Sequence, residues 1–80
     1  MSAQLKFLRR LGEKAACHYT YACPDILELE GGDFAVIGAD ITADAVGKLP
    51  PSVGCGPNER IVRIPRRILI AAKRDIPDTL

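Results

Sequence analysis

The sequence predicts a small single domain of the α+β class, and three observations lead to this prediction. The chain has 80 residues, the size of one domain. Its content of 48% hydrophobic and 26% charged residues is that of a globular protein rather than a disordered one. Apolar residues recur at helical spacing near the N-terminus and alternate further along. The predicted order is an N-terminal helix, an antiparallel sheet of three to four strands built on a hairpin, a short middle helix and a C-terminal strand–helix.

The first segment, residues 1–16, is predicted to be an amphipathic helix. Leu5, Leu8 and Leu11 fall near one stripe at helical spacing, and most of the charged residues fall on the other face. Ser2 suits the N-cap position. Gly12 weakens this helix by about 1 kcal/mol relative to alanine.

The second segment, residues 17–38, is predicted to contain strands and a hairpin. The stretch "CHYTYA" (17–22) alternates as a short strand does, and Pro24 interrupts it. The stretches "ILELE" (26–30) and "DFAVIG" (33–38) read as two strands, and Gly31 and Gly32 between them favour a tight turn.

The rest of the chain divides into residues 39–58, a short helix and a loop, and residues 59–80, a basic strand–helix. Thr42 is expected to cap a helix over 43–49, and the proline- and glycine-rich 50–58 reads as a loop. "RIVRI" (60–64) alternates as a strand. Pro65 suits the first position of a helix over 66–75, with a strand through Leu69 as the alternative.

Composition and charge favour self-association. Only 5% of the residues are aromatic, so the core is thin for a free-standing monomer, and a homodimer would enlarge it. Net charge is +3 over residues 1–16, −5 over 17–50 and +3 over 51–80. This layout predicts that the acidic middle lies against the basic ends, in the same subunit or a neighbouring one.

The three cysteines and the single histidine predict neither a disulfide framework nor a standard zinc site. The chain contains no apolar run of membrane length and no signal-peptide core, so we expect a cytoplasmic protein with reduced cysteines. Zinc sites take ligands in pairs two to four residues apart, whereas Cys17 and Cys23 are six apart and Cys55 has no near partner. A zinc site formed by Cys17, His18, Cys23 and Cys55 is therefore only a third hypothesis, and we expect no cofactor and no catalysis.

The arginines of "RIVRIPRRIL" are the candidate binding residues. Arg63, Arg66 and Arg67, with Arg60 beside them, present guanidinium groups that suit carboxylates or phosphates. The alternative is that they form the water-facing side of an amphipathic segment.

Two resemblances bear on this segment. "RIVRIPRRI" resembles the R-V-x-I-P-x-x-[IL] stretch of AbrB/MazE-type swapped-hairpin DNA-binding proteins, but the acidic hairpin "DILELEGGDFAVI" precedes the stretch here, whereas it follows it in that family. Residues 24–70 are similar to small uncharacterised bacterial proteins encoded beside helix-turn-helix regulators. That resemblance implies an accessory role in regulation and transfers no functional residue.

The sequence thus predicts a non-catalytic protein-interaction module acting as a homodimer. Association is expected through Leu5, Leu8 and Leu11 or through an exposed edge of the hairpin. Arg63, Arg66 and Arg67 are expected to contact an acidic protein partner, and a transcription regulator is one candidate for that partner. The main alternative is an antitoxin-like DNA-binding regulator that uses the Arg60–Arg67 segment.

Overall fold

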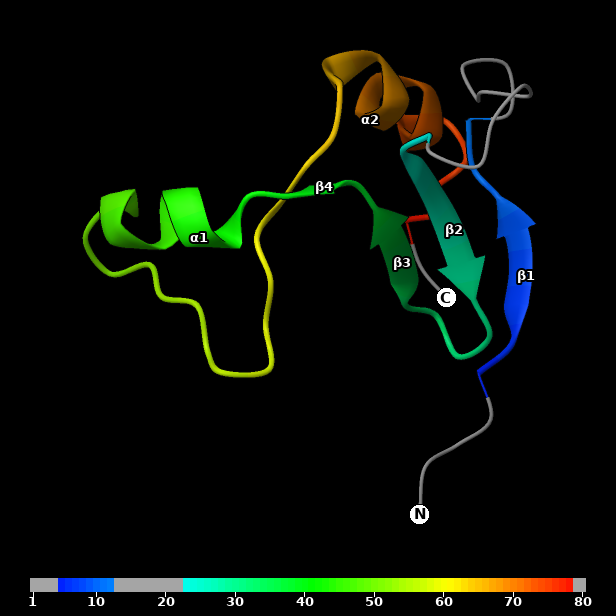
Figure 1. Cartoon of the computed structure of the whole chain (residues 1–80). Coiled ribbons are helices and arrows are strands. Elements are labelled where there is room, and N and C mark those ends of the chain that lie inside the picture. Colours follow the sequence, from blue (N-terminus) through cyan, green and yellow to red (C-terminus); the bar gives the residue numbers. More distant parts are fainter. Residues whose placement is uncertain (1–4, 13–22, 79–80) are drawn as a thin grey trace.

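A computed structural model describes residues 5–12 and 23–78, and its class is α+β, as predicted. The predicted strand over 17–22 lies outside the described residues. The first sheet has the antiparallel order β1-β2-β3, and a separate ladder joins β4 to β5. The elements are β1 (Phe7–Arg10), β2 (Asp25–Leu29), β3 (Phe34–Ile37), β4 (Ala39–Asp40), α1 (Thr42–Ala45), the 3-10 helix η2 (Val46–Lys48), β5 (Val62–Arg63) and α2 (Arg66–Lys73). Figure 1 shows α2 beside one end of the three-stranded sheet and α1 projecting away from it.

The predicted hairpin is confirmed. β2 and β3 pair in antiparallel register from Asp25 opposite Ile37 to Glu28 opposite Phe34. The Leu29 amide donates to the Asp33 carbonyl at 2.9 Å and closes the turn. Gly31 and Gly32 both have φ values near +100° (104° and 103°), a region that residues with a side chain rarely adopt.

The predicted N-terminal helix is wrong where the structure describes it, because Phe7–Arg10 is a strand. β1 pairs with β2, from Phe7 opposite Leu29 to Arg10 opposite Leu27, with a register shift between Phe7 and Arg9. Ladder hydrogen bonds and ion pairs with β2 outweigh the weak helical spacing of the three leucines. Leu11 is 2% exposed, whereas Leu5 and Leu8 are 76% and 51% exposed, so the three leucines do not form one association face.

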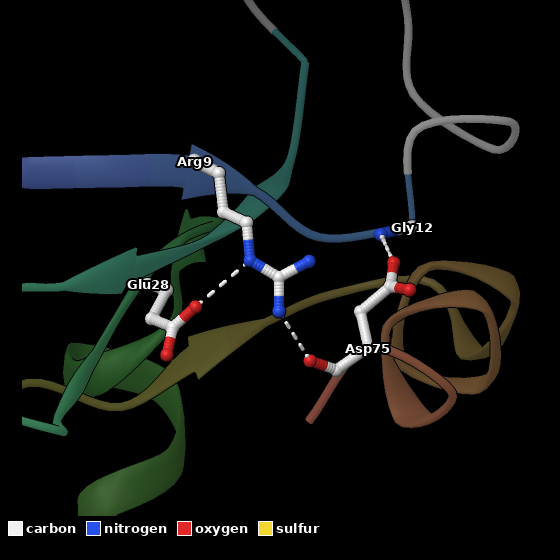
Figure 2. A network of polar contacts seen from close by, with 4 residues as sticks. All are labelled: Arg9, Gly12, Glu28 and Asp75. Carbon is white, nitrogen blue, oxygen red and sulfur yellow. Dashed lines mark hydrogen bonds and ion pairs between the residues drawn. The ribbon is translucent and has the colours of Figure 1, made fainter. Parts of the chain in front are cut away.

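Charge pairing between β1 and β2 confirms, at the N-terminal end, the predicted contact of basic and acidic segments. Arg9 Nε lies 2.9 Å from Glu28 Oε1, and Arg10 Nε lies 2.9 Å from Asp25 Oδ2. Arg9 also donates from Nη2 to the backbone carbonyl of Asp75 at 2.7 Å, so it joins the sheet to the chain that follows α2 (Figure 2).

The hydrophobic core of the described residues is small and joins distant parts of the chain. It consists of Leu11, Ile26, Ile68 and Ala72, with Ile64 packed against it. Gly12 allows this packing: it has φ +64°, and a Cβ there would lie 2.9 Å from both Ala71 Cβ and the Ala72 nitrogen. α2 therefore approaches the end of β1 at backbone distance.

The α-helical part of the middle helix is shorter than predicted and is not capped by Thr42. α1 covers Thr42–Ala45 and η2 covers Val46–Lys48, in place of the predicted 43–49. Ile41 occupies the N-cap position, and no side chain caps the helix. Thr42 Oγ1 instead accepts a bond from the Ile61 amide at 2.8 Å, because the chain that leads into β5 runs alongside. The predicted loop at 50–58 contains no helix or strand, as expected.

The C-terminal strand–helix is confirmed: residues 66–73 form the predicted helix and not the alternative strand. β5 covers only Val62–Arg63 of the predicted 60–64, and α2 covers Arg66–Lys73. Pro65 is the N-cap of α2 rather than its first helical residue, with an extended ψ of 144°. Its carbonyl accepts a bond from the Ile68 amide at 3.0 Å.

Candidate interaction surface

The outer edge of β3 is apolar and pairs with no other described strand. β3 lies at one end of the sheet order, and its sequence is Phe-Ala-Val-Ile. Phe34, Val36 and Ile37 are all exposed, Val36 by 45%. Edge strands of natural proteins usually carry charges, prolines or bulges that prevent pairing with another chain, and β3 has none of these. This edge is therefore competent to accept another strand.

The opposite edge of the sheet, at β1, carries charged side chains and has an irregular register. β1 carries Arg9 and Arg10, with Lys6 just before them, and its pairing with β2 has a register shift between Phe7 and Arg9. Charges and bulges are the usual means by which an edge avoids a further strand. β3 is thus the edge at which this sheet can be extended.

Cross-strand register decides which β3 side chains share a face. Directly opposite residues lie on the same side of a sheet, so Phe34 and Val36 share a face with Glu28 and Ile26. Ile26 packs with the α2 residues of the core, so α2 covers this face at Ile26 and leaves Phe34 and Val36 exposed. Ala35 and Ile37 lie on the other face, and Ile37 is 54% exposed.

The structure places the predicted binding arginines along one exposed stretch but does not bring all of them into one site. Arg63 lies in β5 opposite Ala39, whereas Arg66 and Arg67 occupy the first turn of α2. All three side chains are exposed, and Arg67 makes a polar or electrostatic contact. No acidic residue lies in the first turn of α2, so these two cations face the positive end of the helix dipole. Helix stability alone would favour acidic residues there.

Arg63 lines a groove. The groove has a volume of about 540 Å³ and lies between the β3–β4 connection and the β5–α2 connection; its lining residues are Cys23, Pro24, Ile37, Gly38, Ala39, Arg63, Ile64 and Pro65. A Cβ at Gly38 would lie 2.6 Å from the Arg63 carbonyl oxygen, so glycine permits the close approach of the two chain segments. The result is an apolar groove with one guanidinium group among its lining residues.

Arg60 belongs to a different local network, around Asp40. The Asp40 carboxylate accepts a bond from the Thr42 amide at 3.0 Å. Hydrogen bonds from the Thr42 side chain and backbone, with a smaller contribution from the charge of Arg60, hold the pKa of Asp40 below its ordinary value. Arg60 also donates to the Glu59 carbonyl at 2.9 Å. The Asp40 charge therefore offsets part of the positive field of Arg60.

The cysteines behave differently from the expectation of three reduced thiols. Cys23 is disulfide-bonded, so that expectation is wrong for Cys23; an odd number of cysteines still allows one bond. Cys55 is free, and its Sγ lies 3.3 Å from the Glu59 carbonyl oxygen. A disulfide sulfur cannot bind zinc as a thiolate. Within residues 5–12 and 23–78, no group of three histidine, cysteine or acidic side chains is placed to hold a metal ion, and Cys17 and His18 lie outside these ranges.

No protein-family model matches the chain, and no curated protein or solved structure matches it. Both resemblances noted in the sequence therefore stay predictions. In the described part of the chain, no helix has the length and apolar character needed to cross a membrane.

Proposed function

We propose that the chain is a non-catalytic protein-interaction module that acts as a homodimer and contacts an acidic protein partner through Arg63, Arg66 and Arg67. The observation that carries this proposal is the exposed apolar surface around β3. Large hydrophobic side chains are exposed on this strand, while the described core holds four buried hydrophobic residues. Self-association would bury apolar area that the isolated chain leaves in water.

The homodimer is tested by subunit number. Native mass spectrometry and sedimentation velocity over a range of concentrations should both report a dimer. A monomer at every concentration up to the millimolar range would overturn the homodimer.

The arginine role needs a matched set of variants. In a pull-down with the tagged protein, replacing Arg63, Arg66 and Arg67 together by alanine should abolish retention of acidic partner proteins. The control replaces Lys48, Lys73 and Arg74, which are also exposed, and removes the same charge. Equal retention by the two triple variants would show that the three arginines are not the contact.

The alternative is a DNA-binding, antitoxin-like regulator that uses the Arg60–Arg67 segment, and the exposure of all four arginine side chains favours it. Binding to the DNA upstream of its own gene should then fall steeply with salt, by about 0.9 in the log–log slope for each phosphate contact. Absence of retardation at low salt would end this alternative.

A cytoplasmic location and an accessory role in regulation belong to the proposal as well. The disulfide at Cys23 opposes the location, because reducing compartments keep thiols free. Trapping free thiols with an alkylating agent during cell lysis distinguishes a reducing from an oxidising compartment. A modified Cys23 would place the protein in a reducing compartment.

A further inference from the structure

We infer that β3 pairs with β3 of a second copy, antiparallel about a two-fold axis at Ala35, so that the two three-stranded sheets become one continuous sheet. This inference rests on the proposed homodimer and names the surface that forms it. The free backbone groups of the β3 edge, the register and the side chains all favour this pairing.

The free backbone groups on the outer edge follow from the hairpin. The Leu29 amide bonds to the Asp33 carbonyl, and inward and outward backbone groups alternate along an antiparallel strand. Asp33, Ala35 and Ile37 therefore direct their N–H and C=O groups toward β2. Phe34 and Val36 direct theirs away from it, to the side on which the described chain has no further strand.

The register follows from symmetry and from Gly38. Two identical antiparallel edges meet about an axis perpendicular to the sheet, so each face continues into the same face. The axis passes midway between one residue and the same residue of the second copy. An axis at Ala35 sets Phe34 opposite Val36 of the partner subunit. The outward N–H and C=O groups of Phe34 and Val36 in both copies then form four hydrogen bonds. An axis at Val36 would set Phe34 opposite Gly38 of the partner subunit, and Gly38 already lies against the Arg63 backbone.

The side chains fit the Ala35 register. It forms two aromatic–β-branched pairs of Phe34 with Val36 of the partner subunit, a favourable cross-strand combination. The small Ala35 side chains meet at the axis. Asp33 comes opposite Ile37 of the partner subunit, which lines the same groove as Arg63. The acidic end of each β3 thus approaches the partner's Arg63, and the charges are complementary.

A cross-link gives the direct test. Opposed residues of a non-hydrogen-bonded pair have Cα atoms about 4.5 Å apart, within the range that a disulfide spans. In a Cys55→Ser background, Ala35→Cys should therefore form a covalent, reducible dimer under mild oxidation. Ala43→Cys, exposed on α1, is the control and should stay monomeric on a non-reducing gel.

A second variant tests the β3 edge without introducing a covalent cross-link. Val36→Lys should weaken the dimer by about tenfold or more, because an ammonium group would lose water at the interface. Leu8→Lys, at a similarly exposed position of β1, should leave the dimer constant unchanged. Melting curves confirm that both variants are folded; if Val36→Lys does not fold, the Ala35→Cys cross-link decides alone.

The outcomes separate this inference from the proposed function. If the wild-type chain is a dimer but Ala35→Cys does not cross-link and Val36→Lys remains equally dimeric, the β3 pairing is wrong and the homodimer stands. If the wild-type chain is a monomer, both are wrong.

Discussion

The backbone amide of Gly12 donates a hydrogen bond to the carboxylate of Asp75, with 2.8 Å between the nitrogen and Oδ2 (Figure 2). Asp75 follows α2, and its backbone carbonyl accepts the bond from Arg9 described above. Asp75 therefore connects the end of α2 to β1 and the residues just after it, through both its side chain and its backbone carbonyl. This contact accompanies the packing of Ile68 and Ala72 into the core.

Asp75→Ala should lower the free energy of unfolding by about 1–2 kcal/mol, because the partly buried Gly12 amide loses its acceptor. Urea denaturation followed by circular dichroism measures the change. Asp78→Ala, an exposed carboxylate three residues on, is the matched control and should change stability by less than about 0.5 kcal/mol. Equal effects of the two variants would argue against this connecting role.

Gly12→Ala should destabilise the fold by about 2–4 kcal/mol, because the new Cβ meets both a left-handed backbone and the α2 chain. Gly54→Ala serves as the control: a Cβ there has no atom within 4 Å, and the expected change is small. Thermal melting of the two variants side by side provides the comparison. A Gly12 variant as stable as the wild type would mean that α2 does not approach β1 so closely.

Asp40 should titrate below its ordinary value of 3.8, with Thr42 as the larger cause and Arg60 as the smaller. Because the pKa is lower in the folded state than in the unfolded state, the Asp40 contribution to stability is present above about pH 3.8. It is lost as the pH falls through the folded-state value. NMR titration of the carboxyl group measures this pKa. Thr42→Ala should raise it more than Arg60→Ala does, and the reverse order would contradict the hydrogen-bond assignment.

Iodoacetamide added to the oxidised protein in denaturant should modify Cys55 and leave Cys23 unmodified, because only Cys55 is a free thiol of the two. After reduction, both should react, and peptide mass spectrometry locates the labels. Modification of Cys23 without reductant would show that the disulfide does not form in solution.

The sequence predicts those parts of the fold that depend on local signals. Gly31 and Gly32 between two apolar strands mark the hairpin, and Pro65 before an amphipathic run marks α2. β1 depends instead on contacts across the chain, which Arg9 makes with Glu28 and with Asp75. No local pattern around Leu5, Leu8 and Leu11 contains those partners, so helical spacing led to the wrong element.

The candidate interaction surface also has one part that the sequence predicts and one part that it does not. An exposed hairpin edge is predictable from the two strands on either side of Gly31 and Gly32 and from the absence of charge in "FAVI", and the structure identifies the edge as that of β3. The groove beside Arg63 is not predictable, because it exists only where Gly38 and Arg63 meet, 25 positions apart along the chain. Glycine at position 38 was the one available signal, and glycines have many other uses.

The four core residues of the described chain come from two separated parts of it, Leu11 and Ile26 before α1 and Ile68 and Ala72 in α2. The intervening chain, which includes α1 and the loop at 50–58, contributes none of them. A single cut in that loop would therefore leave two fragments, each holding half of the core and neither able to close it alone. The two fragments would therefore suit a fragment-complementation experiment: after mixing, the fold would return only when they bind to each other.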